Sequence, residues 1–129
     1  MGDRIQEELQ LLRQRFPGLE FWEDGRWVFL PHYTLPSGIW ERDEVAVCFQ
    51  IPPGYPGQKP YGFYVSPRVQ LKGGGEVKNR TDSAEPPFAG EWAKFSWDLP
   101  AWHATADLQA GSNLLNFVLT FRARFEQGT

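Results

Sequence analysis

The first part of the chain has the hydrophobic pattern of an amphipathic helix over residues 3–16. Its apolar positions recur every three or four residues and so share one face, with charged and amide side chains on the other. These positions are Ile5, Leu9, Leu12 and Phe16. Asp3 is a favourable N-cap residue, and Gln6 can complete a capping box with it. Pro17 and Gly18 follow, and we therefore predict that the helix ends there.

The pattern then changes to that of strands joined by short turns. Residues 45–51 are the clearest case, because every second residue is a large apolar one. Residues 19–22 and 27–30 flank an Asp-Gly pair at positions 24–25, which is a hairpin signal. Residues 61–65 form an aromatic strand-like segment. Neighbouring strands with short connections predict a four-stranded antiparallel meander.

The remainder of the chain predicts a long irregular loop followed by helices. Residues 66–91 are polar, with a run of three glycines, and a loop of this length is usually functional or disordered. After a short extended segment, residues 102–110 are compatible with a short helix and residues 112–126 with a final one, for which Ser112 is a good N-cap. This order predicts one α+β domain over residues 1–129, with helices packed against one sheet.

Composition and charge narrow the class of protein and its partners. The chain has 129 residues, a net charge of -3 and 41% hydrophobic residues, which is typical of one globular domain. The nearest approach to a basic cluster is Arg122 with Arg124, so we expect no nucleic-acid partner. No run approaches the roughly 20 apolar residues of a membrane span. A single cysteine, Cys48, excludes an intrachain disulfide and fits a reducing, cytoplasmic location.

Few residues offer metal-binding or nucleophilic chemistry. The only histidines are His32 and His103, and Cys48 is the only thiol, so the paired spacing of a metal site is missing. We therefore expect no metal and no other cofactor. Cys48 lies within the alternating segment 45–51, where we interpret it as a small apolar residue. We interpret His32 as a turn or surface residue.

Several segments, taken in order, resemble the E2/UBC superfamily of ubiquitin-conjugating proteins, in particular its divergent bacterial members. The resemblance extends over nearly the whole chain, because each segment stands where the family has a matching one. The segments are residues 4–9 (first helix), 45–51 with Tyr55-Pro56 and Pro60 (strand and Tyr-Pro…Pro turn), 61–67 (next strand), 95–99 (Phe-Ser-Trp-Asp-Leu for Ile-Cys-Leu-Asp-Ile), and Trp102 with the final helix (Trp-x-Pro and its following helix).

Two departures from that family concern the active-site segment. Serine stands at position 96, where the resemblance places the catalytic cysteine, and no His-Pro-Asn tripeptide precedes it. The resemblance implies a UBC-like fold and a role in a bacterial ubiquitin-like conjugation pathway. The implied partners are an E1-like adenylating enzyme and a ubiquitin-like protein (Ubl). In such a pathway, Ser96 would accept the C-terminal acyl group of the Ubl as an oxyester. A hydroxyl needs a base to take its proton, and the candidates nearby in sequence are Asp98 and His103.

Aromatic and charged residues point to two further contact sites. Three tryptophans recur every five residues, and they predict either packing or an aromatic wall around Ser96 that holds the Ubl tail. They are Trp92, Trp97 and Trp102. By its position in the family, the first helix is expected to meet E1, although a solvated helix face is the alternative. Its candidate contacts are Arg4, Glu7, Glu8 and Arg13.

Two other functions stay open at this point. Without the cysteine and the tripeptide, the domain is also consistent with a catalytically inactive E2-like scaffold that binds the E1-like enzyme or the Ubl. The third possibility is an α+β binding module that is unrelated to E2 proteins.

Overall fold

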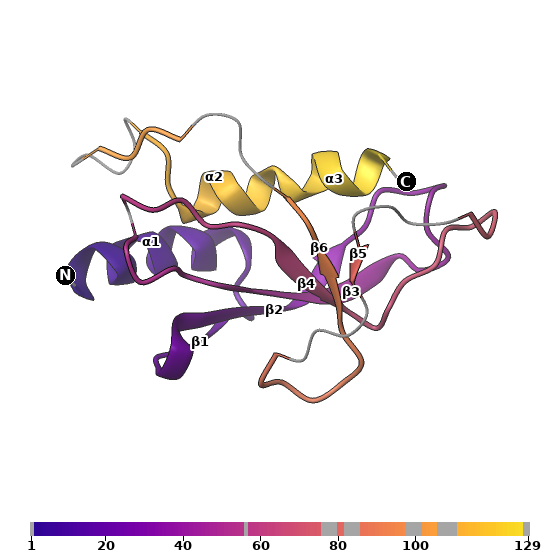
Figure 1. The fold of residues 1–129 in the computed structure, drawn as a ribbon, viewed down its shortest axis with the longest axis horizontal. Helices are drawn as coiled ribbons and strands as arrows, with labels where there is room; N and C mark the ends of the chain where they lie inside the picture. The colour runs from indigo at the N-terminus through magenta and orange to yellow at the C-terminus, as the bar shows by residue number, and fades with distance from the viewer. Residues whose placement is uncertain are drawn as a thin grey trace.

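The computed structural model describes residues 2–55, 57–75, 80–81, 86–97, 102–105 and 111–127. It has an α+β fold, in which helices lie along one face of an antiparallel sheet (Figure 1). The helices are α1 (Gly2–Arg15), the 3-10 turn η1 (Asp24–Arg26), α2 (Leu114–Leu119) and α3 (Phe121–Gln127). The strands are β1 (Glu20–Trp22), β2 (Trp27–Thr34), β3 (Glu44–Gln50), β4 (Phe63–Ser66), β5 (Arg80–Thr81) and β6 (Ala93–Phe95).

The amphipathic helix predicted over residues 3–16 is confirmed as α1. Its apolar stripe faces the core, with Leu9 and Leu12 fully inaccessible to solvent, Ile5 buried and Phe16 partly buried. Phe16 continues the last turn through a hydrogen bond from its N–H to the carbonyl of Leu12, at 2.8 Å. The Pro-Gly pair then ends the helix, because proline lacks a donor N–H for a further turn. The chain passes directly into β1.

The sheet begins as the predicted meander and then continues beyond it. The strand order is β1-β2-β3-β4-β6-β5, and each neighbouring pair is antiparallel. The prediction of four strands is therefore wrong, since β6 adds to β4 with Phe95 opposite Phe63. The predicted Asp-Gly hairpin turn is instead the longer η1, in which Gly25 has a φ of 78° and Arg26 a φ of 54°.

The segment 66–91 is less irregular than the sequence predicts. Its described part contains β5, and Leu71 forms an isolated antiparallel bridge with Trp40. Arg80 fixes the segment further, because its guanidinium Nη1 donates to the carbonyl of Val69 at 2.6 Å. The described part of the predicted loop is therefore joined to β6 through β5, to Trp40 through Leu71, and to itself through Arg80 and Val69.

The C-terminal part also departs from its prediction. The single helix expected over residues 112–126 is divided into α2 and α3 at Thr120, whose hydroxyl donates to the carbonyl of Phe117 at 2.6 Å. Asn113, and not Ser112, is the N-cap, and it forms a capping box with Asn116. Residues 102–105 are not helical, and the rest of the helix predicted over 102–110 lies outside the described residues.

Aromatic side chains dominate the core between the helices and the sheet. The Phe63 ring from β4 stacks on the Phe121 ring from α3, with centroids 3.9 Å apart. Phe49 from β3 meets Phe117 and Phe121 edge-on. All four rings are fully buried. Because fully burying one such side chain contributes about 1.5–3 kcal/mol, this cluster is a principal source of the stability of the fold.

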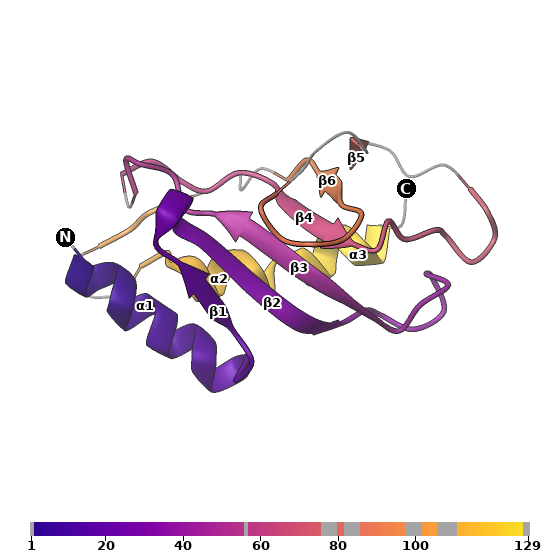
Figure 2. The ribbon, with the colours of Figure 1, turned by 90° about the horizontal axis from the view of Figure 1, so that it is seen from below.

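The opposite face of the sheet has an aromatic cluster of its own. Residues 86–92 cross this face, and Figure 2 shows them in front of the sheet with α2 and α3 behind it. The Phe88 ring stacks on Phe29 from β2 at 4.7 Å and meets Trp22 from β1 edge-on at 4.6 Å. Trp92 packs against both Phe29 and Phe88. The segment before β6 is therefore packed on the sheet by its own aromatic side chains.

Candidate functional site

Ser96 lies where β6 ends, on a backbone that stays attached to the neighbouring strand. The three residues before it are paired with β4. The residue after it, Trp97, accepts a hydrogen bond through its carbonyl from the N–H of Gly62 at 2.8 Å. The Ser96 side chain is partly exposed. The structure thus presents a hydroxyl at the end of a strand whose backbone is fixed on both sides.

The structure describes only one of the two candidate bases, His103. Asp98 lies outside the described residues. The His103 backbone is held by Ser112, whose hydroxyl accepts from the His103 N–H at 3.0 Å, while the imidazole ring is exposed. Within the described ranges, no hydrogen bond joins Ser96 to His103. Neither residue is therefore placed as the proton acceptor, and both stay predictions.

Lys94 is a cationic residue near Ser96 that the sequence interpretation missed. Its Nζ lies 5.6 Å from the ring centroid of Tyr64 and 6.0 Å from that of Tyr61. Its Cε is 3.3 Å from the position that a Cβ would take on Gly62. The side chain therefore extends along the sheet toward the segment that holds Ser96. The sequence did contain a signal for this position of Lys94. The alternation of residues 93–95 places residue 94 on the face of the sheet away from the helices.

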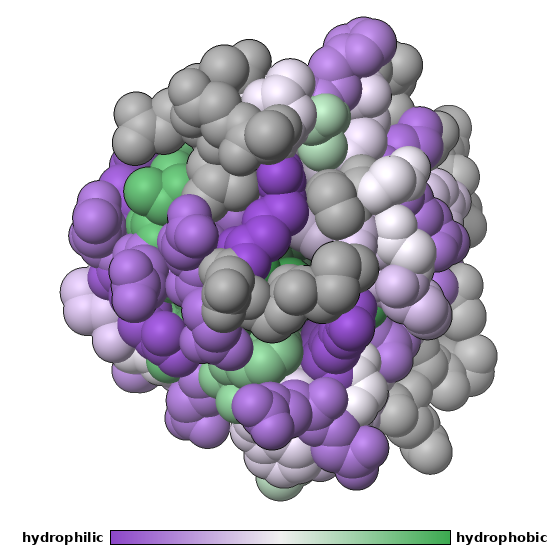
Figure 3. All heavy atoms as spheres, turned by 90° about the vertical axis from the view of Figure 1, so that its left-hand side faces the viewer, coloured by the Kyte–Doolittle hydropathy of each residue, from purple (hydrophilic) through white to green (hydrophobic). Residues whose placement is uncertain are grey.

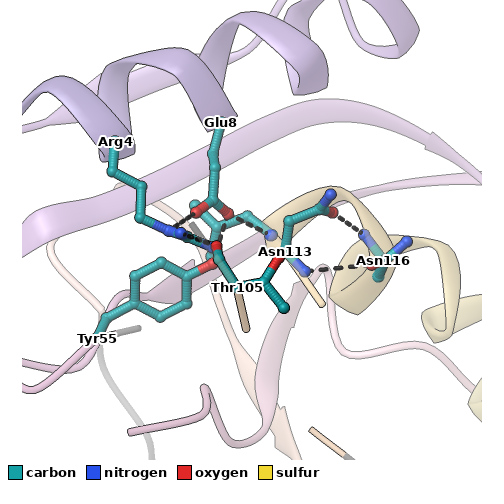
Figure 4. A network of polar contacts seen from close by, with 7 residues as sticks. Arg4, Glu8, Tyr55, Thr105, Asn113 and Asn116 are labelled. Carbon is teal, nitrogen blue, oxygen red and sulfur yellow. Dashed lines mark hydrogen bonds and ion pairs between the residues drawn. The ribbon is translucent and has the colours of Figure 1, made fainter. Parts of the chain in front are cut away.

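A buried carboxylate joins α1 to the parts of the chain that surround the C-terminal helices (Figure 4). Glu8 Oε1 accepts from the backbone N–H of Leu114 at 2.7 Å, and also from the Tyr55 hydroxyl. Glu8 Oε2 accepts from Arg4 Nε at 2.8 Å. Arg4 Nη1 in turn donates to the carbonyl of Thr105. We call these residues, Arg4, Glu8, Tyr55, Thr105 and Leu114, the Glu8 network.

The Glu8 network corrects part of the predicted E1 contact surface. Glu8 is completely buried, so its proposed place on an exposed surface is wrong. Arg4 is drawn toward Glu8 and Thr105, and its side chain is only 20% exposed. Glu7 and Arg13 are exposed. The described residues on the end of the molecule that carries the start of α1 are mostly hydrophilic (Figure 3). The exposed part of the predicted surface is thus Glu7 with Arg13.

The Tyr55 hydroxyl is held in its protonated form by this arrangement. Burial first, and then the hydrogen bond to the Glu8 carboxylate, raise the pKa of Tyr55 well above its usual range. The phenol is thus a hydrogen-bond donor at all physiological pH values. Tyr55 begins the Tyr-Pro segment that resembles the E2 turn. Its hydrogen bond to Glu8 connects the start of this segment to α1.

Comparison with known proteins assigns the family. The family model described as prokaryotic E2 family E matches residues 6–115, which include most of α1, the whole sheet and Ser96. The chain belongs to prokaryotic E2 family E. No curated protein and no solved structure matches it. The resemblance to divergent bacterial E2 proteins is thereby confirmed, and with it a general role of E2 type in a conjugation pathway.

In this E2 family E protein, the three tryptophans of the predicted Ubl-tail groove do not line one surface. Trp92 is 2% exposed and donates through Nε1 to the carbonyl of Phe88 at 3.1 Å, within the cluster on the outer sheet face. Trp97 donates through Nε1 to the Thr120 hydroxyl at 3.0 Å, beside the helices. The Trp102 ring lies 5.8 Å from that of Tyr55. Trp92 is thus a packing residue, whereas Trp97 and Trp102 are partly exposed.

Cys48 is expected to be unreactive in the folded E2 family E protein. It is fully buried in β3, and burial raises the pKa of its thiol far above the usual range. Since the thiolate is the reactive form, we predict that DTNB labels the native protein at least about 100-fold more slowly than the urea-unfolded protein. Absorbance at 412 nm measures both rates. Equal rates would contradict the burial of Cys48 in the folded protein.

Within the described residues, no group of three His, Cys, Asp or Glu side chains is placed to hold a metal ion. His32 is exposed in β2, and its Nδ1 lies 2.9 Å from Glu44 Oε1, which fits the expected surface position. No helix in the described part of the chain is long and apolar enough to span a bilayer.

Proposed function

We propose that this chain is the E2-like component of a ubiquitin-like conjugation pathway and that Ser96 carries the C-terminal acyl group of the Ubl as an oxyester. The observation that carries the proposal is the position of Ser96. It lies at the end of β6, partly exposed, in the segment whose sequence resembles that of the E2 catalytic cysteine. Family membership over residues 6–115 supports the pathway. A UBC-like fold, with α1 preceding the meander and helices following it, belongs to the same proposal.

The proposed reaction is a transfer from thioester to oxyester. Ser96 Oγ attacks the carbonyl carbon of the Ubl thioester on the E1-like enzyme, and its hydroxyl proton goes to a base, for which Asp98 and His103 are candidates. A bond forms between Oγ and the acyl carbon, the carbon–sulfur bond breaks, and the E1 thiolate leaves. An amine of the acceptor then attacks the oxyester, an amide forms, and the serine hydroxyl is restored.

The partners belong to the same proposal. The exposed face of α1, with Glu7 and Arg13, is the proposed contact for the E1-like enzyme. Trp97 and Trp102 are the tryptophans left for contact with the Ubl tail, because Trp92 is buried on the outer sheet face. The proposed compartment is the cytoplasm, which fits a chain with one cysteine.

A scaffold without acyl transfer is the second candidate. It is favoured by one specific observation, since no described side chain is hydrogen-bonded to Ser96 as a base would be. In this alternative, the E1-like enzyme or the Ubl binds the same surfaces, and Ser96 carries no acyl group. The two candidates therefore differ in covalent chemistry and not in their partners.

Intact-mass analysis separates the two candidates. The wild type and Ser96→Ala are each incubated with the E1-like enzyme, ATP and the Ubl. We predict that the wild type gains the mass of one Ubl minus water, that hydroxide removes this mass, and that Ser96→Ala gains nothing. Ser37→Ala is the control, because Ser37 is exposed in the connection between β2 and β3, outside β6 and away from both candidate bases in the sequence. An adduct of equal yield on Ser96→Ala would overturn the acyl-carrier proposal, and stable complexes without any adduct would favour the scaffold.

A further inference from the structure

Ser96 and Lys94 lie on the same face of the sheet, the outer face away from the helices. Phe95, which stands between them, is fully buried in the core. Trp97, on the other side of Ser96, donates through Nε1 to the Thr120 hydroxyl at 3.0 Å, beside the helices. The alternation of β6 therefore continues through residue 97 and places residues 94 and 96 together on the outer face. Two such residues are about 6.6 Å apart along a strand.

The Lys94 side chain is directed along the strand toward Ser96. Lys94 is opposite Tyr64 in the register of β4 and β6, and the same register carried two residues further brings Gly62 beside Ser96. The Lys94 Cε lies 3.3 Å from the position that a Cβ would take on Gly62. Its Nζ lies 5.6 Å from the ring centroid of Tyr64 and 6.0 Å from that of Tyr61, the residue before Gly62. The ammonium group therefore stands on the Ser96 side of its own backbone.

Gly62 leaves the space that this lysine occupies. Its φ is 71°, a conformation that glycine adopts without strain. A Cβ at this position would lie 3.1 Å from the Phe95 carbonyl oxygen and would also crowd Lys94 Cε. Because the Gly62 N–H donates to the Trp97 carbonyl, the glycine backbone is fixed beside the segment that holds Ser96. The path of Lys94 toward Ser96 is thus built into the sheet.

The charge of Lys94 is held by aromatic rings and not by a carboxylate. Among the residues that the structure describes, Lys94 forms no ion pair, and its ammonium group interacts with the rings of Tyr61 and Tyr64. The side chain is partly exposed. Ring contacts of this kind are weak at exposed sites, so the ammonium group is able to turn toward an anion that forms within its reach.

The transfer proposed for Ser96 creates such an anion. When Ser96 Oγ attacks the acyl carbon, an electron pair of the carbonyl group moves to the acyl oxygen, which stays an oxyanion until the carbon–sulfur bond breaks. A charged hydrogen-bond donor beside this oxygen accelerates the reaction, because the negative charge develops only on the way to the intermediate. Lys94 is a described cation on the face that Ser96 shares.

We propose that Lys94 is a catalytic residue of this transfer and that its ammonium group donates a hydrogen bond to the acyl oxyanion formed at Ser96. This role rests on the proposed function of Ser96 as acyl carrier. The carbonyl group then re-forms, the electron pair of the carbon–sulfur bond leaves with the E1 thiolate, and the serine proton goes to the separate base. Lys94 keeps its protons, and no bond to its Nζ forms. The same contact serves the second step, in which an amine attacks the oxyester.

Single-turnover transfer from the purified E1–Ubl thioester to the full chain tests this role. Intact-mass analysis of quenched samples gives the rate constant of adduct formation and the thioester concentration that half-saturates it. We expect Lys94→Gln to lower the saturating rate constant at least about tenfold and to leave the half-saturating concentration within about twofold. Lys94→Arg keeps the charge and the donors, and it should regain at least about a third of the wild-type rate constant. Lys72→Gln is the matched control, because Lys72 is exposed and lies outside β6.

Each outcome of the transfer assay decides the role of Lys94. A wild-type rate constant for Lys94→Gln would overturn it, and so would a loss that appears only in the half-saturating concentration. Lys94→Arg as slow as Lys94→Gln, with both variants at the wild-type urea midpoint, would overturn the assignment to the oxyanion. If the wild type forms no adduct, the acyl-carrier proposal and this role fail together. An adduct that wild type and Lys94→Gln form at the same rate removes the role of Lys94 alone.

Discussion

Replacing Glu8 with alanine is expected to lower the free energy of unfolding by about 3 kcal/mol. The carboxylate is fully buried and accepts hydrogen bonds from Arg4, Tyr55 and the Leu114 backbone. Its removal leaves these donors in an apolar interior without their acceptor, which costs more than the hydrogen bonds themselves. Urea unfolding, followed by tryptophan fluorescence, measures the change.

The neighbouring residue provides the control for this prediction. Glu7 is on the same helix and has the same side chain, but it is exposed. Glu7→Ala should therefore change the free energy of unfolding by no more than about 0.5 kcal/mol. Glu8→Gln, which keeps an acceptor oxygen but loses the charge opposite Arg4, should fall between the two. A Glu8→Ala protein as stable as Glu7→Ala would show that the Glu8 network does not hold the fold together.

Phe121→Ala is expected to destabilise the protein by about 4 kcal/mol. Phe121 stacks on Phe63 at 3.9 Å and contacts Phe117 and Phe49, so its removal opens a cavity between α3 and the sheet. The surrounding rings are rigid and fill such a space only in part. The thermal midpoint by circular dichroism should fall together with the urea midpoint.

Leu119→Ala is the control for the aromatic core. Leu119 is two residues away, at the end of α2, but it is 41% exposed. Its truncation removes little buried area and should cost less than about 1 kcal/mol. If the two variants were equally stable, the helices would not be packed on the sheet through Phe121, and the described core would be wrong.

Local sequence patterns were sufficient to predict the elements that bury one face. The apolar stripe of α1 and the alternation in residues 45–51 show by their periodicity alone which side chains face the core. The addition of β6 to β4 did not follow, because it depends on pairing between residues about 30 positions apart, such as Phe63 and Phe95. The division of the C-terminal helix at Thr120 depends on a local side-chain hydrogen bond that competes with the helix.

The candidate site was predictable only in part, because it too depends on contacts between residues far apart in the sequence. Ser96 stands out in the sequence because of the segment around it, but Lys94 becomes relevant only when Gly62 and Tyr64 are beside it. The helix charges, taken one by one, predict that Glu8 is a surface residue. It lies next to Leu9 in the apolar stripe, however, and its buried partners come from Tyr55 and Leu114 far along the chain. Long-range partners of this kind are invisible to periodicity.

Tandem mass spectrometry of the protein after its reaction with the E1-like enzyme, ATP and the Ubl tests the acyl-carrier proposal most directly. Trypsin cleaves after Lys94 and then after Arg122, so Ser96 lies in the peptide 95–122. We predict that this peptide carries the C-terminal remnant of the Ubl on Ser96, that hydroxide removes it, and that cleavage after Lys94 remains complete. A remnant on Lys94 or on any other residue, stable to hydroxide and present in Ser96→Ala, would contradict the proposal that Ser96 is the acyl carrier.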